Sequence, residues 1–236
     1  MHMNFQSFRE TLERDGIVVF TLKDTIRLIR KPSGYARLFL NRLAARGLIL
    51  HIERGKYCLP DANELEVASN LIYPSYISFL SALSVHHLTT QLPIQMQVAC
   101  ARQKKPVEFH GAPIVFIKLR KKALFGFRRF DGAFVAEPEK AIVDGLYLPE
   151  RMPIAEAFYA LKQGEVDLGK LCEYAERMGS ATVKRRLGFL LEKAGIRWNV
   201  RLKNEPTTRY TLLNPFLGRD GARNKKWMIV ENEVLE

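Results

Sequence analysis

Cysteine is scarce in this sequence, and its three cysteines stand far apart. Cys58, Cys100 and Cys172 form no CxxC pair and have no histidine at the spacing of a zinc ligand set. Widely separated cysteines, odd in number, exclude the disulfide framework that stabilises small secreted domains. We therefore expect buried thiols in a reducing compartment and no metal site.

Long hydrophobic runs are also missing. No apolar stretch approaches the ~20 residues that are needed to span a bilayer. Residues 1–4 lack the basic and then apolar order of a signal peptide. The sequence therefore predicts a protein that does not enter the membrane and remains in the cytoplasm.

Motifs of catalysis are absent as well. His86 and His87 belong to no HExxH pattern, no serine lies in a GxSxG elbow, and no glycine-rich loop is suited to phosphate. A metal-dependent nuclease needs two acids and a lysine in the order (D/E)-x-K, but Pro138 stands two positions before Lys140. We expect no catalytic residues and no cofactor. The alternative is a nuclease site, tested by magnesium-dependent cleavage of duplex DNA, whose members would be Asp131, Glu137, Glu139 and Lys140.

The acidic residues of this segment have a structural explanation. Glu137 and Glu139 flank a proline at a helix start, where the helix dipole favours negative charge. Asp144 falls on the apolar part of the same helix, so we expect it to be a buried hydrogen-bonding group.

Positive charge is abundant and lies at the two ends of the chain. The net charge is +12, with 11 basic and 5 acidic residues in positions 1–60, 14 and 14 in positions 61–180, and 12 and 6 in positions 181–236. Lysine and arginine neutralise phosphates and release counterions, so this distribution favours a nucleic-acid partner. The alternative is a general solubility charge.

Residues 17–59 have the element order of a winged helix-turn-helix. A partial capping box at Thr21 and Asp24 opens one short helix, and Pro32 is expected to end it. A second helix is expected over residues 33–46, with Gly47 at its C-terminal cap, followed by a hairpin with a basic tip. A preceding helix that carries Phe5, Phe8 and Leu12 completes a three-helix core.

The second helix has the side chains of a recognition helix. Arginine reaches a guanine edge in bidentate fashion, asparagine pairs with adenine, and leucine contacts a thymine methyl. Residues at the helix start and on the wing suit phosphates. The predicted DNA-binding set is Lys31, Ser33, Tyr35, Arg37, Leu38, Asn41, Arg42, Arg54 and Lys56. The alternatives are a helical hairpin with a solvated charged face, or a winged helix that binds protein.

The rest of the chain predicts a larger domain of mixed structure. A polar, turn-prone segment over residues 60–63 separates a domain at 1–60 from one at 61–236. Helices are expected over residues 64–72, 76–88, 138–147, 154–163, 168–178 and 181–194. Strands are expected over residues 95–101, 107–110, 114–119, 210–213 and 227–230, with a short strand pair at 127–135 and a loop at 214–226. The fold class is therefore α+β, with a winged helix-turn-helix followed by a larger mixed α/β domain.

This larger domain carries two further basic groups, which together give a second predicted basic surface. The first lies around an aromatic segment, and basic residues interleaved with aromatics can hold a nucleic-acid backbone. Its members are Lys118, Arg120, Lys121, Lys122, Arg128 and Arg129. The second would extend the phosphate contacts of the head and comprises Lys184, Arg185, Arg186, Arg223, Lys225 and Lys226. A solvated hairpin edge protected by charge explains the first group equally well.

Four segments follow one another in a distinctive order: RGKY at 54–57, SALSVHHLT at 81–89, AEPEKAIVD at 136–144 and KRRLGFLLE at 184–192, with Trp227 near the end. In this order they resemble the AbiEi-type antitoxins of type IV toxin–antitoxin systems, over nearly the whole chain. The AEPEKA and RLGFLLE segments are the most specific, and neither has a catalytic meaning. His87 departs from the family, in which glycine is more usual at that place.

The resemblance implies a bifunctional repressor. The winged head would bind double-stranded DNA at repeats in the promoter of its own operon. The mixed domain would counteract a nucleotidyltransferase toxin, in this class without a stable complex between the two. We expect a monomer or a weak homodimer. The alternative is a winged-helix transcription factor that senses a small ligand and has no antitoxin role.

Overall fold

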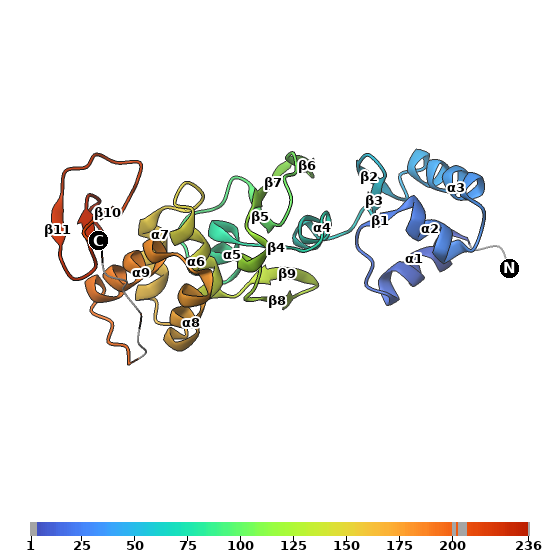
Figure 1. Ribbon diagram of the computed structural model, residues 1–236. Coiled ribbons are helices and arrows are strands. Elements are labelled where there is room, and N and C mark those ends of the chain that lie inside the picture. The colour runs from blue at the N-terminus through green and yellow to red at the C-terminus, as the bar shows by residue number, and fades with distance from the viewer. Residues whose placement is uncertain (1–3, 200–201, 203–206, 236) are drawn as a thin grey trace.

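The computed structural model describes residues 4–199, 202 and 207–235 and shows a mixed α+β fold (Figure 1). Met1, His2 and Met3, on which the expectation about a signal peptide partly depends, lie outside the described residues. Figure 1 shows the N-terminal elements at one end of the chain and a small C-terminal sheet at the other. Nine α-helices and three sheets are present in the described residues.

The N-terminal elements, which we call the head, consist of three helices and a three-stranded sheet. They are α1 (Phe5–Arg14), β1 (Phe20–Thr21), α2 (Leu22–Ile29), α3 (Ser33–Ala45), β2 (Leu50–Glu53) and β3 (Lys56–Cys58). The sheet has the antiparallel order β1-β3-β2. Its core contains Phe8, Leu12, Phe20, Ile29, Ala36, Leu40, Leu43 and Ile49. The expected helix positions and the expected hairpin are confirmed.

The start of α2 is better specified than the sequence indicated. The Asp24 N–H donates to Thr21 Oγ1 at 3.3 Å, and the Thr21 N–H donates to Asp24 Oδ2 at 3.0 Å, so the capping box is complete. The expectation that Pro32 ends this helix is wrong. The helix ends at Ile29 because Arg30 adopts a left-handed conformation, with φ of 52°, and Pro32 instead precedes the first turn of α3.

The remaining residues, which we call the body, contain a six-stranded sheet of order β6-β7-β5-β4-β9-β8. Its strands are β4 (Ser75–Ile77), β5 (Met96–Cys100), β6 (Val107–Phe109), β7 (Ala112–Lys118), β8 (Phe127–Phe130) and β9 (Ala133–Ala136). The pairs β5/β7 and β4/β9 are parallel and the others are antiparallel. Helices α4 (Glu64–Asn70) and α5 (Phe79–Val85) and the 3-10 turn η1 (Lys121–Ala123) connect these strands.

The expected helix over residues 76–88 is wrong in its first part. Tyr76 and Ile77 belong to β4, where Ile77 pairs with Val98 on one side and Val135 on the other. A short apolar run has no periodicity that separates a buried strand from a buried helix, and here the sheet ladder decides. The helix α5 begins only at Phe79.

Four helices follow the sheet and build the larger core against one of its faces. They are α6 (Pro138–Tyr147), α7 (Ile154–Lys162), α8 (Leu168–Met178) and α9 (Ala181–Lys193). A second small sheet of order β10-β12-β11 ends the chain, from β10 (Thr211–Leu212), β11 (Ala222–Asn224) and β12 (Ile229–Glu231). β11 lies inside the segment expected to be a loop. Its three residues are too few for a readable alternation, and it forms through pairing with β12.

The head and the body share one hydrophobic cluster. Cys58 of β3 is fully buried with Val98 and Phe116 from the opposite face of the body sheet, and Leu50 and Ile52 of β2 pack against the same cluster. Side chains from both parts therefore pack in one buried cluster. The expected boundary at residue 60 separates two segments of the sequence, but hydrophobic packing continues across it.

Candidate nucleic-acid interface

The outer face of α3 exposes four of the residues that were predicted to contact bases. Arg37, Leu38, Asn41 and Arg42 are all exposed, whereas Ala36, Leu40 and Leu43 on the opposite side are buried in the head core. Their spacing of one, four and five residues places them on one side of a helix of 3.6 residues per turn. Leu38 is 48% exposed between the two arginines, so this face offers both donors and an apolar contact.

The chain around α3 is uniformly positive. From residue 25 to residue 52 the sequence holds six arginines and lysines and no carboxylate. Lys31 is half-buried and Ser33 is exposed at the N-terminus of the helix, where backbone N–H groups favour an anion. Tyr35 is 38% exposed on the first turn. This end of α3 therefore suits phosphate groups.

A groove of about 800 Å³ runs beside this N-terminus, between α1 and the turn that joins α2 to α3. Cationic side chains line it from both sides, contributed by Arg14, Arg27, Arg30 and Lys31. Groups of this kind position a duplex through its backbone and carry no sequence information of their own.

The hairpin of the head has one exposed basic residue at its tip and one that turns inward. Arg54 is exposed, but Lys56 is half-buried, donates to the Leu71 carbonyl of the body and lies 2.9 Å from Glu53 Oε1. The structure therefore places Lys56, which was predicted to contact phosphate, against internal partners. The reason is the shared cluster, which brings β3 against the body and gives the ammonium group internal partners.

Glu53 links the hairpin to the body through a second lysine. Lys104, from the loop after β5, forms an ion pair with Glu53 and also lies 5.0 Å from the centre of the Phe116 ring. Burial opposes ionisation of Glu53, but the hydrogen bonds and charges of Lys104 and Lys56 outweigh it and hold the pKa of this carboxyl below its ordinary value. Sequence reasoning missed this link because Glu53 and Lys104 are 51 residues apart.

The first additional basic group does not form one surface. Its six members are exposed, but β7, which ends at Lys118, and β8, which carries Arg128 and Arg129, are separated in the sheet by β5, β4 and β9. Arg120 lies 5.6 Å from the centre of the Tyr147 ring. Arg129 points instead toward the head, where its Nη2 would be 3.3 Å from a Cβ placed on Gly16.

For the second additional basic group, the prediction of an exposed basic surface is wrong for three of its six members. Lys184, Arg185 and Arg186 are buried at 5%, 8% and 4% exposure. Arg186 donates to the carbonyls of Leu146 at 2.8 Å and Leu212 at 3.2 Å, and burial lowers its pKa to about 10. Three consecutive cations at residues 184–186 are typical of a solvated helix face. Here, however, α9 is covered by α6, α7 and α8 and by β12 of the C-terminal sheet.

The other three members of that group are exposed at the far end of the molecule. Arg223, Lys225 and Lys226 belong to the C-terminal sheet and its loop, and Lys226 is 2.9 Å from Glu192. Figure 1 places β11 at the end of the molecule opposite α3. These residues therefore do not continue the surface of the head.

Three of the four residues of the alternative nuclease site, Glu137, Glu139 and Lys140, are engaged in other contacts. Lys140 and Asp144 are a fully buried ion pair on α6. The Tyr174 hydroxyl donates to Glu137, which also lies 2.9 Å from Lys170, and Glu139 accepts the N–H of Asp167 at 2.9 Å. Lys140 is consequently out of reach of a substrate.

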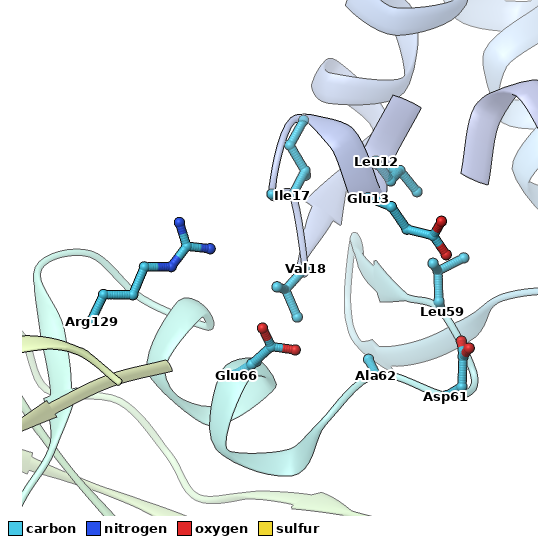
Figure 2. Close-up of a pocket in the computed structure, with 10 residues that line it drawn as sticks. Leu12, Glu13, Ile17, Val18, Leu59, Asp61, Ala62, Glu66 and Arg129 are labelled. Atoms are coloured by element: carbon cyan, nitrogen blue, oxygen red, sulfur yellow. The ribbon is translucent and has the colours of Figure 1, made fainter. Parts of the chain in front are cut away.

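A pocket of about 300 Å³ lies where the head meets the body (Figure 2). Apolar side chains of the head line one side, and Glu66 of α4 and Arg129 of β8 contribute opposite charges from the body. Figure 2 shows Arg129 extending toward the turn that carries Ile17, with Glu66 below Val18. Two glycines make room for these groups. A Cβ on Gly132 would overlap the Glu66 carboxylate, and a Cβ on Gly16 would lie 3.3 Å from Arg129 Nη2.

Comparisons with known proteins bear on the fold. No family model matches the chain, and no curated protein matches it. Among solved structures it is similar to the crystal structure of the Rv2827c protein from Mycobacterium tuberculosis, with a TM-score of 0.60 and 15% identity over 94% of this chain and 88% of that one. The two proteins share their fold. In the described part of the chain, no helix is long and apolar enough to cross a membrane.

Proposed function

We propose that this chain is a winged helix-turn-helix repressor that binds double-stranded DNA at repeats in its own promoter and serves as the antitoxin of a type IV toxin–antitoxin system. The observation that carries the DNA-binding part is the outer face of α3, where Arg37, Asn41 and Arg42 are exposed together on a helix with a well-packed opposite side. The location consistent with this function is the cytoplasm.

In this proposal α3 enters the major groove. Arg37 and Arg42 donate to guanine edges, Asn41 pairs with adenine, and Leu38 contacts a thymine methyl. Lys31, Ser33 and Tyr35 meet the backbone at the helix start, and Arg54 meets it at the hairpin tip. Lys56 stays with the body.

The antitoxin part rests on the resemblance to AbiEi-type proteins. Its two most specific segments have structural tasks here. AEPEKA supplies Lys140 of the buried pair with Asp144, and RLGFLLE places Gly188 where a Cβ would overlap the Trp227 ring. Such segments specify how the body packs. They support a shared architecture with that family, from which the counteraction of a nucleotidyltransferase is proposed.

Co-expression with a neighbouring nucleotidyltransferase gene tests the antitoxin role. We expect the wild-type chain to restore growth of cells that express the toxin, and the full-length Arg37→Ala/Arg42→Ala variant to restore it equally while losing promoter repression. The variant is preferable to deletion of the head, because deletion would expose the shared cluster around Cys58 and Phe116. Failure of the wild-type chain to restore growth would rule out the antitoxin role.

The pocket between head and body favours a second candidate function, a transcription factor that responds to a small ligand. Pockets at the junction of two parts, lined by apolar groups and a few polar ones, are common ligand sites. The surroundings of the gene separate the two candidates. An adjacent nucleotidyltransferase gene supports the antitoxin, and a metabolic operon supports the ligand sensor.

A further inference from the structure

The parallel pairing of β5 and β7 brings two basic loops together at one edge of the body sheet. Cys100 at the end of β5 is opposite Lys118 at the end of β7, and the Leu119 N–H donates to the Cys100 carbonyl at 2.8 Å just beyond the pair. The loop after β5 contains Arg102 and Lys105, and Lys118 closes β7. The pairing of β5 with β7 thus brings cations from two segments that are distant in sequence to the same edge of the sheet.

This edge lies beside the head. Along β7, Ile114 and Phe116 face the cluster shared with the head, while Ile117 faces the helices, so Lys118 continues the head-side row. Lys104 spans the gap, because its ammonium group lies over the Phe116 ring and pairs with Glu53 of β2. The hairpin tip with Arg54 follows Glu53 directly.

The charges at this edge are predominantly positive. Arg102, Lys105 and Lys118, which we call the junction cations, are exposed, and no acidic partner for them is present among the described residues. The carboxylate beside them, Glu53, is already shared by Lys56 and Lys104. Three exposed cations therefore adjoin the basic tip of the hairpin.

We propose that the junction cations bind the backbone of duplex DNA on the hairpin side of the head, so that one rigid surface runs from α3 through Arg54 onto the body. This inference rests on the proposed DNA-binding function and deepens it. The shared cluster and the Glu53–Lys104 pair fix the body against the head, so these cations add phosphate contacts without further ordering of the chain. They contribute affinity and no base discrimination.

The test is the salt dependence of DNA binding by two full-length triple variants. The first, Arg102→Gln/Lys105→Gln/Lys118→Gln, removes the junction cations. The matched control, Arg219→Gln/Arg223→Gln/Lys225→Gln, removes three exposed cations at the opposite end of the molecule. Each is titrated at several salt concentrations with a 40-base-pair duplex, once from the region upstream of its own gene and once shuffled.

We expect the slope of log affinity against log salt to become shallower by about 2 to 3 in the junction variant, because each phosphate contact contributes about 0.9. The control is expected to change by less than about 1. The ratio of affinities for the upstream and shuffled duplexes should remain that of the wild type in both variants.

An unchanged slope in the junction variant, or an equal loss in both variants, would overturn the inference. Failure of the proposed function looks different. In that case the wild-type chain would bind upstream and shuffled duplexes equally, while the slopes on either duplex would still show whether the junction cations meet phosphates. Circular dichroism melting of both variants confirms that any loss is not due to unfolding.

Discussion

Arg37→Ala combined with Arg42→Ala is expected to abolish the shift of a promoter fragment by the full-length chain. Each arginine is exposed on the outer face of α3, and loss of a bidentate contact to guanine costs about 1 to 3 kcal/mol. If the two effects add, affinity falls by roughly 30-fold to 20,000-fold. Titration of the labelled promoter fragment at one fixed salt concentration measures this change.

A second pair of exposed arginines supplies the control for that experiment. Arg197→Ala/Arg209→Ala removes the same charge from the C-terminal part of the body, and we expect its affinity to stay within a few-fold of the wild type. Wild-type affinity in the Arg37/Arg42 variant would contradict the assignment of α3 as the recognition helix. An equal loss of affinity in both variants would show that the chain binds DNA only through general attraction between opposite charges.

Lys140→Ala is expected to lower the free energy of unfolding by about 3 to 5 kcal/mol. Lys140 and Asp144 are fully buried, and Asp144 also accepts hydrogen bonds from the hydroxyls of Ser78 at 2.7 Å and Tyr76 at 3.1 Å. Burial lowers the pKa of Lys140 and raises that of Asp144, while their mutual attraction opposes both changes. Removal of the lysine leaves a buried carboxylate without its counter-charge.

Urea denaturation of two further variants separates this effect from the loss of any lysine. Lys170→Ala breaks an exposed ion pair with Glu137 and should cost less than about 1 kcal/mol. Lys140→Met/Asp144→Leu removes both charges and should recover part of the stability lost in Lys140→Ala, since an apolar pair needs no desolvation. A cost below about 1 kcal/mol for Lys140→Ala would show that this pair does not stabilise the body.

The head was largely predictable because its signals are local. Thr21 and Asp24 lie within one turn, Gly47 follows the last periodic residue of α3, and the hairpin is made by neighbouring segments. The body was harder to predict. The sheet ladder decides that Tyr76 and Ile77 form a strand, and pairing with β12 makes a strand of residues expected to be a loop.

The candidate site divides in the same way. Exposure of Arg37, Asn41 and Arg42 follows from the periodicity of their own helix, so the sequence was sufficient. Packing against distant elements decides the remaining cases. Lys56 turns inward because β3 meets the body, and Arg186 is buried because two backbone carbonyls from distant segments receive its guanidinium group. The pattern of charges in the sequence predicts neither the inward turn of Lys56 nor the burial of Arg186.

We propose that α3 of this chain reads sequence on duplex DNA. The most direct test is the ratio of affinities of the wild-type, full-length chain for a duplex from upstream of its own coding region and for a shuffled duplex of equal length and composition, at one salt concentration. We predict a ratio of about 1,000 or more, as is typical of specific binding. Equal affinity for the two duplexes would show that α3 does not read sequence.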